Sequence, residues 1–212
     1  MTGRPYGGRD PQQRQRERRD RLLAAALELY GTAGYNPTTI ADVCRTAGVA
    51  PAHFYELFGS REELLRVLYD EIVTTTFDAV LAAVADQSVD PAVRVRAGLT
   101  AYCDHLLTDP RRARVQCIEV VGVSAEMEAH RRAVIRQYAE FLAAELNAIN
   151  DRRPNPAEPD PASDALLATA VVGGVNEAMI DWLLLDERPP VSALLSGLTL
   201  MLTAVADARL NP

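Results

Sequence analysis

Apolar residues in this chain recur at helical spacing almost from end to end, and no segment alternates apolar and polar residues with the period of a strand. Glycine, proline or a capping residue bounds each helical segment. These segments are residues 14–33, 40–46, 51–57, 61–86, 91–107, 111–122, 126–150, 163–185 and 191–210. The chain is therefore predicted to be all-α, with about nine helices.

Charge is divided unevenly along the sequence. The 212 residues carry a net charge of −7, but residues 1–61 hold nine Arg against six acidic residues, a net charge of +3. The remainder carries −10. This asymmetry indicates a basic module, suited to nucleic-acid phosphates, attached to an acidic body.

Composition narrows the class of protein further. Hydrophobic residues make up 48% and charged residues 24%, as in a soluble globular protein. No stretch approaches the roughly twenty uninterrupted apolar residues of a membrane-spanning helix, and the N-terminus lacks the apolar core of a signal peptide. Three cysteines, an odd number, fit reduced thiols better than disulfides. We expect a cytoplasmic protein without a membrane partner.

Sites for metal or cofactor chemistry are not expected. His105 and His130 are isolated, with no Glu or Cys at metal-ligand spacing. The sequence has no Gly-rich phosphate loop, nucleophile elbow or zinc-binding His-Glu-x-x-His helix. We therefore predict no catalytic residues, no metal site and no cofactor.

The most informative segment lies between residues 34 and 65. Thr38 or Thr39 can cap a helix over 40–46, a turn containing Gly48 follows, and Pro51 opens a second short helix. Two short helices joined by such a turn form a helix-turn-helix, whose second helix enters the DNA major groove.

The ordered residues of this segment resemble the tetracycline-repressor (TetR) family of bacterial transcriptional regulators. The matches are Gly34-Tyr35, Thr38-Thr39-Ile40, Val43, Ala47-Gly48-Val49, Phe54-Tyr55, Phe58 and Ser60-Arg61-Glu62-Glu63-Leu64. The resemblance implies a regulator, most often a repressor, with an N-terminal three-helix DNA-binding domain and a C-terminal helical domain for effector binding and dimerisation. It also implies that Thr39, Tyr55 and Arg61 bind phosphates.

One departure from the family pattern changes how DNA bases are read. Members usually carry Ser-x-Gly before the aromatic pair, where this chain has Ala50-Pro51-Ala52. Methyl groups can touch thymine but cannot form bidentate hydrogen bonds, so His53 becomes the best direct reader, with Arg45 second. The predicted DNA-binding residues are Thr38, Thr39, Arg45, Ala50, Pro51, Ala52, His53, Tyr55 and Arg61. We expect Phe54 and Phe58 to form core.

Three regions are expected along the chain. Residues 1–13 form a flexible basic arm, which either contacts DNA or only aids solubility. Residues 14–60 form the DNA-binding domain, and residues 61–212 bind effector and dimerise. The homodimer is expected to form through residues 163–186 and 191–210, because each carries more apolar surface than one covered face requires.

The effector is predicted to be a largely apolar small molecule bound among the helices of residues 61–185. Candidate lining residues are Phe77, Tyr102, Cys103, Leu106, Cys117, Val121, Tyr138, Phe141, Asn176, Met179 and Trp182. The same residues would also describe an ordinary core. Asn176, Glu177 and Asp181 lie on a face that borders solvent or pairs with Arg across an interface, or else one of them points into the cavity.

Two alternatives remain open at this point. One is an all-α enzyme or small-molecule-binding protein without affinity for DNA, which the basic, hydroxyl-rich first sixty residues disfavour. The other is a regulator that recruits a protein rather than sensing a metabolite, which a sealed C-terminal core would favour. The preferred partner is a double-stranded DNA operator.

Overall fold

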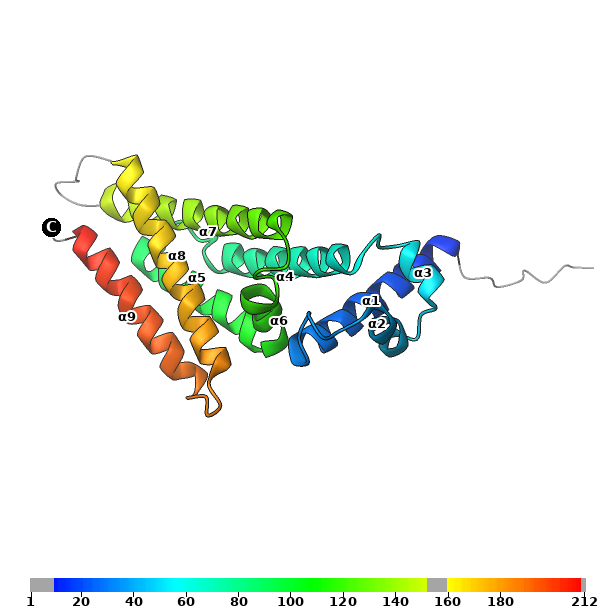
Figure 1. Cartoon of the computed structure of the whole chain (residues 1–212). Coiled ribbons are helices and arrows are strands. Elements are labelled where there is room, and N and C mark those ends of the chain that lie inside the picture. Colours follow the sequence, from blue (N-terminus) through cyan, green and yellow to red (C-terminus); the bar gives the residue numbers. More distant parts are fainter. Residues whose placement is uncertain (1–9, 152–159, 211–212) are drawn as a thin grey trace, which may run out of the picture. The chain divides into compact units, whose positions relative to one another are not determined.

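The computed structural model describes residues 10–151 and 160–210, and these residues form helices and connecting loops without a strand (Figure 1). The helices are α1 (Pro11–Thr32), α2 (Ile40–Ala47), α3 (Pro51–Tyr55), α4 (Arg61–Ala83), α5 (Pro91–Leu107), α6 (Pro110–Arg114), α7 (Ala125–Asp151), α8 (Pro161–Leu184) and α9 (Val191–Leu210). The all-α prediction is confirmed. Residues 1–9 of the expected arm lie outside the described residues, and residues 11–13 form the first turn of α1.

The chain divides into two compact units, Met1–Leu68 and Tyr69–Pro212. Helix α4 runs through the boundary, so its first turns belong to the N-terminal unit and the rest to the C-terminal unit. Leu64 and Leu65, in those first turns, are fully buried. This burial explains why the first unit extends past residue 60 into α4.

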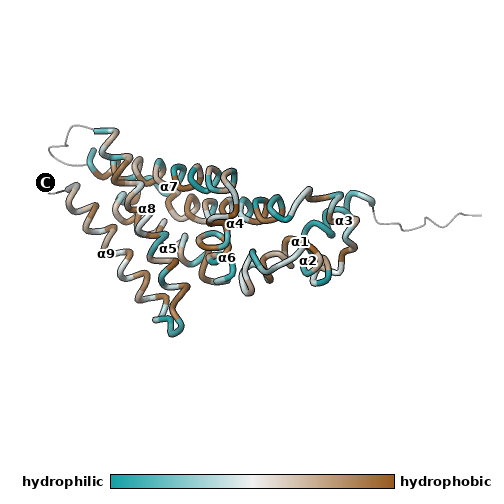
Figure 2. Tube along the Cα trace, viewed as in Figure 1, coloured by the Kyte–Doolittle hydropathy of each residue, from teal (hydrophilic) through white to brown (hydrophobic). Residues whose placement is uncertain are grey.

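The N-terminal unit encloses its own small core. Leu22, Ala26 and Tyr30 recur every four residues along α1 and are fully buried, whereas the first half of the helix is polar. Phe54 and Phe58 are 0% and 2% exposed, as expected for core residues. Figure 2 shows the same contrast along α1, with hydrophilic residues before hydrophobic ones.

The turn between α2 and α3 depends on two local features. Thr39 caps α2, because its hydroxyl accepts from the Asp42 N–H while Asp42 accepts from the Thr39 N–H. Hydrogen bonds from the Thr39 hydroxyl, its N–H and Arg45 lower the pKa of Asp42 to about 2. Gly48 then ends α2 at φ +61°, a left-handed conformation that favours glycine.

One predicted helix differs in shape. The sequence suggests a single helix over 111–122, but α6 ends at Arg114 and a π-helical segment, η1 (Val115–Glu119), follows. Arg114 Nε donates to Glu119 Oε1 at 2.9 Å, joining residues five apart as the π-helical hydrogen bonds do. Gly122, in the loop before α7, has a φ of +73°.

In the C-terminal unit, aromatic contacts establish the helix directions. The Tyr69 and His130 rings lie 5.8 Å apart, and the Phe77 and Tyr138 rings lie 5.1 Å apart, so α4 and α7 run in the same direction. Arg94 binds Glu145, and the Tyr102 and Tyr138 rings lie 5.6 Å apart, so α5 runs in the opposite direction.

Helices α8 and α9 each carry two apolar faces. One face packs inside the chain, where Met179 is fully buried and Leu198 is 4% exposed. The other face is exposed and rich in small residues: Leu166, Ala170 and Gly173 on α8, and Ala193, Gly197, Leu200 and Ala204 on α9. We call these residues the α8–α9 stripes. In Figure 2 hydrophobic residues extend along most of α9.

By length and composition alone, α8 is the one described helix that could cross a membrane. Only 28% of its most apolar 18-residue window is buried inside the chain, because the stripe face is uncovered. The helix packs against α7 and α9, and it carries the exposed acidic residues Glu177 and Asp181. These features match a helix at the surface of a helical bundle.

Candidate nucleic-acid interface and ligand cavity

Helix α3 presents a mostly apolar surface to solvent. Ala50, Pro51 and Ala52 are exposed, and the Tyr55 side chain is one of the most exposed apolar groups of the chain at 61%. Phe54 lies on the opposite side of the helix, buried in contact with Phe58 at a ring distance of 5.7 Å. The helix is therefore anchored by one face and free to contact a ligand with the other.

His53 is held in place by a neighbouring carboxylate. Its Nδ1 lies 2.8 Å from Glu56 Oε2 and 3.4 Å from Arg18 Nη1. The shorter contact, to a carboxylate that can only accept, favours a ring proton on Nδ1, whereas the Arg18 guanidinium can only donate. With the proton on Nδ1, Nε2 is a hydrogen-bond acceptor on the other side of the ring.

Thr39 and Arg45 stand near the two ends of α2. The Thr39 side chain is engaged in capping, where its hydroxyl donates to Asp42 Oδ2 at 2.6 Å. The Arg45 side chain is 73% exposed and pairs with Asp42 at 2.5 Å. An exposed pair of this kind is weak, so the guanidinium is available to another anion.

Thr38 is a correction to the predicted DNA-binding set. It is only 4% exposed, and its hydroxyl donates to the Gly34 carbonyl oxygen at 2.7 Å. The hydroxyl closes the loop that follows α1, so it is not free to bind a phosphate. Its neighbour Thr39 occupies the helix start instead.

Arg61 serves a structural purpose that the sequence did not reveal. Its Nη1 donates to the carbonyl oxygens of Tyr35, Asn36 and Thr38 at 3.2, 3.3 and 2.5 Å. The guanidinium also stacks over the Tyr35 ring at 4.1 Å. Arg61 thereby fixes the loop before α2 to the start of α4, and its remaining nitrogens are left for any phosphate contact.

Replacing Arg61 with Met should lower the free energy of unfolding of the full chain by about 2 kcal/mol, because two partly buried carbonyl oxygens lose a charged donor. Arg61→Lys should retain part of this stability, since one ammonium can reach fewer of the three oxygens. Chemical denaturation followed by circular dichroism measures both. Arg96→Met, an exposed change on α5, is the control. Equal stability of Arg61→Met and Arg96→Met would show that the loop does not depend on Arg61.

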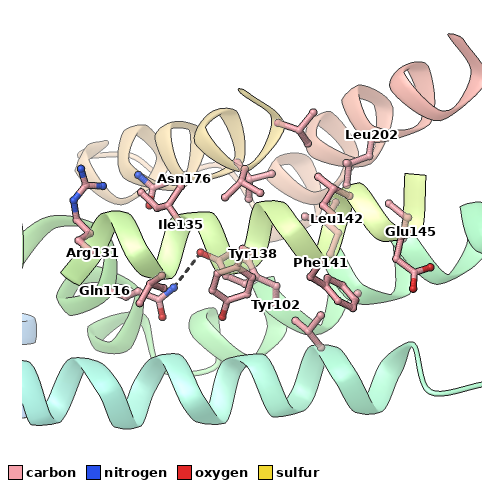
Figure 3. A pocket seen from close by; sticks show the side chains of 18 of the residues that line it. Tyr102, Gln116, Arg131, Ile135, Tyr138, Phe141, Leu142, Glu145, Asn176 and Leu202 are labelled. Atoms are coloured by element: carbon pink, nitrogen blue, oxygen red, sulfur yellow. Dashed lines mark hydrogen bonds between the residues drawn. The ribbon is translucent and has the colours of Figure 1, made fainter. Parts of the chain in front are cut away.

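The C-terminal unit contains an elongated cavity with an empty volume of about 870 Å³, part of it open to solvent. Helices α4, α5, α7, α8 and α9 and the η1 segment all contribute to its wall. Most lining residues are aliphatic or aromatic, and Figure 3 shows the labelled side chains gathered along α7. A cavity lined in this way suits a small, mostly apolar molecule.

One face of α7 sets the length of the cavity. Arg131, Ile135, Tyr138, Leu142 and Glu145 recur every three or four residues and all line it. Fourteen residues separate the first from the last, which corresponds to about 21 Å along a helix axis. Figure 3 shows Arg131 and Glu145 at opposite ends of this row.

A small polar cluster interrupts the apolar wall. Gln116, 7% exposed on the π-helical segment, donates through Nε2 to the Tyr102 hydroxyl at 3.2 Å. Gln116 Oε1 and the Tyr138 hydroxyl are buried with no hydrogen-bond partner among the described residues. Buried polar atoms without partners are costly, so these two are candidates to bind a ligand.

Both charged residues of the wall are already paired. Arg94 donates through Nε and Nη2 to Glu145 Oε2 at 3.0 and 2.8 Å, in a pair that is almost fully buried. Arg131 binds both oxygens of Glu128 at 2.9 Å, and hydrogen bonds from Arg131 and Arg132 lower the pKa of Glu128 to about 2. Each charged residue of the wall therefore binds a residue of opposite charge.

Four of the predicted lining residues face this cavity: Tyr102, Tyr138, Phe141 and Asn176. The other seven do not. Phe77 packs behind Tyr138 and Phe141, Val121 is 53% exposed on the surface, and Cys103, Leu106, Cys117, Met179 and Trp182 are buried in the surrounding core. Burial raises the pKa of both the Cys103 and the Cys117 thiol to about 12, as expected for inert core thiols.

The residues missed by sequence reasoning include the most polar ones. Gln116, Arg131 and Glu145 line the cavity, as do aliphatic residues of α5 and α8. Arg131 and Glu145 each lie seven residues from Tyr138, about two turns of α7, so the helical spacing in the sequence could have placed them on the same face. Among residues 10–151 and 160–210, no three His, Cys, Asp or Glu side chains gather where they could hold a metal ion.

Comparisons with known proteins agree with this division of the chain. Residues 22–68 match the family model described as "Bacterial regulatory proteins, tetR family". The transcriptional regulator EthR of Mycolicibacterium smegmatis is 26% identical over 192 residues, covering 91% of this chain and 86% of that protein. TtgR of Pseudomonas putida, also a transcriptional regulator, is 28% identical over 177 residues, covering 81% and 82%.

Solved structures show the same fold along most of the chain. The fatty acid degradation regulator FadR of Bacillus halodurans superposes with a TM-score of 0.77 at 19% identity, covering 92% of this chain and 96% of that one. FadR of Bacillus subtilis in complex with stearoyl-CoA gives 0.72 at 17% identity, covering 91% and 97%. The full-length sequence relatives are named regulators rather than enzymes. The DNA-binding region of the TetR family therefore spans residues 22–68 of this chain, and over most of its length the chain is similar to transcriptional regulators of that family.

Proposed function

We propose that this regulator is a cytoplasmic repressor that binds a palindromic operator as a homodimer and is released by a small, mostly apolar effector. One observation carries the proposal. The chain combines an exposed helix-turn-helix surface with a separate, elongated apolar cavity whose wall contains unsatisfied polar atoms. A protein without DNA affinity would not need the helix-turn-helix surface, and a regulator that only recruits proteins would not need the cavity.

In the proposed complex α3 lies in the major groove. Ala50, Pro51 and Ala52 contribute apolar contacts to thymine methyl groups, and His53 Nε2 accepts from an adenine or cytosine amino group. Arg45, on the preceding helix, is the second direct reader. Few hydrogen-bonding readers remain, so groove shape carries part of the specificity.

Phosphate contacts supply affinity without sequence preference. We assign them to the exposed Tyr55 hydroxyl, to the exposed Thr39 hydroxyl, which would exchange its hydrogen bond to Asp42 for one to a phosphate, and to the guanidinium nitrogens of Arg61 that do not bind carbonyls. The basic arm, outside the described residues, would add further contacts. Affinity should therefore fall steeply with salt concentration.

The proposed dimer covers the α8–α9 stripes. A Cβ atom at Gly173 or Gly197 would meet no other atom of the same chain within 4 Å. The surface beside both glycines is therefore open to a second copy. Small residues along both stripes would let helices of a second copy approach closely. A two-fold dimer places two recognition helices on half-sites about 34 Å apart.

Effector and DNA would be coupled through α4. This helix begins with Arg61 in the N-terminal unit and lines the cavity with Tyr69 and Val80. A ligand shifts an equilibrium only by its different affinity for the two states. We therefore propose that the bound effector favours an arrangement of α4 that does not fit the operator.

A binding-site selection from random duplex DNA tests the DNA-binding proposal. Wild-type protein should enrich an inverted repeat with adenine or cytosine at the position read by His53. His53→Ala should relax one or two positions per half-site, by about 1–3 kcal/mol. Tyr55→Phe should weaken all sequences alike, by about 1 kcal/mol, because it removes one phosphate contact.

His105→Ala, a change on α5 outside the DNA-binding unit, is the matched control and should leave the selected sequence unchanged. Enrichment of no sequence by the wild-type protein would refute operator binding. Identical preferences of wild type and His53→Ala would remove His53 as a reader and leave shape and the arm to explain specificity.

A further inference from the structure

We propose that the effector is an elongated, uncharged, apolar molecule whose polar end donates a hydrogen bond, as an alcohol or an N–H amide does, and not a carboxylate or other anion. This inference rests on the proposed function, since it names the chemical class that would occupy the cavity. Three features of the wall carry it: its length, its unpaired acceptor and its paired charges.

The length of the cavity calls for an extended ligand. The α7 row from Arg131 to Glu145 spans about 21 Å at 1.5 Å per residue. Toward the Glu145 end the wall is aliphatic, with Val80, Val95 and Leu142 among its residues. An apolar chain lying along α7 would bury most of its surface there, at about 25 cal/mol per Å².

The unpaired acceptor calls for a donor on the ligand. Gln116 Nε2 donates to the Tyr102 hydroxyl at 3.2 Å. The other atom of the amide, Oε1, is buried and has no hydrogen-bond partner among the described residues. The Tyr138 hydroxyl, also unpaired, can donate to the same ligand group.

A ligand hydroxyl would satisfy both orphaned atoms together, because it donates and accepts through one oxygen. It would donate to Gln116 Oε1 and accept from the Tyr138 hydroxyl. An ether or ester oxygen can only accept, so it would leave Oε1 without a partner. A buried acceptor left unpaired disfavours binding by roughly a factor of ten relative to a paired one.

The paired charges disfavour an anion. Arg94 gives two donors to Glu145 and a third to the Val89 carbonyl, so it has no donor directed at a ligand. Arg131 gives its Nε and Nη2 donors to Glu128, which also accepts from Arg132. A carboxylate entering the cavity would lose its hydration and would compete with Glu128 for Arg131, and it would meet Gln116 Oε1 as a second acceptor.

Isothermal titration calorimetry on the full chain, with three probes of matched chain length, tests the inference. The probes are 1-decanol, decyl methyl ether and decanoate. We expect 1-decanol to bind about ten-fold more tightly than the ether, and decanoate to bind more weakly than either. Equal affinities of decanol and ether, tighter binding of decanoate, or no binding of 1-decanol up to its solubility limit would each overturn the proposal.

Two variants locate the effect. Gln116→Leu should remove the preference for decanol over the ether, because Oε1 is gone, while leaving the ether affinity within about two-fold. Gln137→Leu makes the same chemical change at an exposed position of α7 and should keep the full ten-fold preference. A preference that survives Gln116→Leu in the folded variant would show that the donor binds elsewhere.

The result is separable from the test of the proposed function. If decanoate binds in the cavity and releases the selected DNA, the ligand class is wrong and the ligand-responsive regulator stands. If 1-decanol binds as expected but the chain binds no DNA, the regulator proposal falls and the ligand class stands.

Discussion

Replacing Leu200 with Glu should convert the protein to a folded monomer at micromolar concentration and lower its affinity for the selected DNA by about 100-fold or more. Leu200 is 72% exposed in the chain, so the substitution costs little within one protomer. In the proposed dimer it would bury a carboxylate against the apolar stripe of a second copy, which is strongly unfavourable. Loss of the dimer also removes the gain from binding two half-sites at once.

Light scattering after size-exclusion chromatography measures the mass, and fluorescence anisotropy measures the DNA affinity. Val121→Glu introduces the same charge at a position that is 53% exposed between η1 and α7, outside the α8–α9 stripes. That control should remain dimeric and bind DNA normally. A dimeric Leu200→Glu protein would place the interface elsewhere.

Replacing Arg94 with Met should lower the free energy of unfolding of the chain by about 3–5 kcal/mol, because it leaves the buried carboxylate of Glu145 without a counter-ion. Arg94 is 4% exposed, and its side chain donates both to Glu145 and to the Val89 carbonyl oxygen at 2.9 Å. The pair joins α5 to α7 at one end of the cavity. Its loss should therefore also weaken ligand binding.

The double variant Arg94→Met/Glu145→Met should recover most of the lost stability, because no unpaired charge remains. Arg96→Met, an exposed change two residues away, should alter the unfolding free energy by less than about 0.5 kcal/mol. Denaturant titrations of the wild type, Arg94→Met, Glu145→Met and the double variant give the coupling energy of the pair. A single variant as stable as the Arg96 control would mean that solvent reaches Glu145 and replaces Arg94.

The helices and the helix-turn-helix could be predicted because local chemistry specifies them. Proline opens α3, α5 and α8 near their predicted starts, Thr39 caps α2, and Gly48 ends it in the left-handed conformation. The exposure of Tyr55 and the burial of Phe54 followed from their positions on one short helix. These features depend on residues within a few positions of one another.

The cavity wall and the role of Arg61 could not be predicted in the same way. Tyr102 and Cys103 are neighbours on α5, yet only Tyr102 faces the cavity, because about 100° of helix rotation separates adjacent residues. The sequence pattern does not tell which of two apolar faces of a helix meets the cavity. Arg61 binds carbonyl oxygens of residues that lie more than twenty positions earlier in the chain. A contact between such distant positions cannot be predicted from local sequence spacing.

Filling the cavity without a ligand tests the central claim, that occupation of the cavity controls DNA binding. Val175, on the α8 side of the wall, can be replaced by Phe to place a ring in the empty space. The measurement is the anisotropy-based affinity of Val175→Phe for the DNA enriched by the wild-type protein, with the variant shown to be folded and dimeric. We predict an affinity at least about ten-fold weaker than wild type. An unchanged DNA affinity, in a variant that no longer binds a cavity ligand, would contradict control of DNA binding by the cavity.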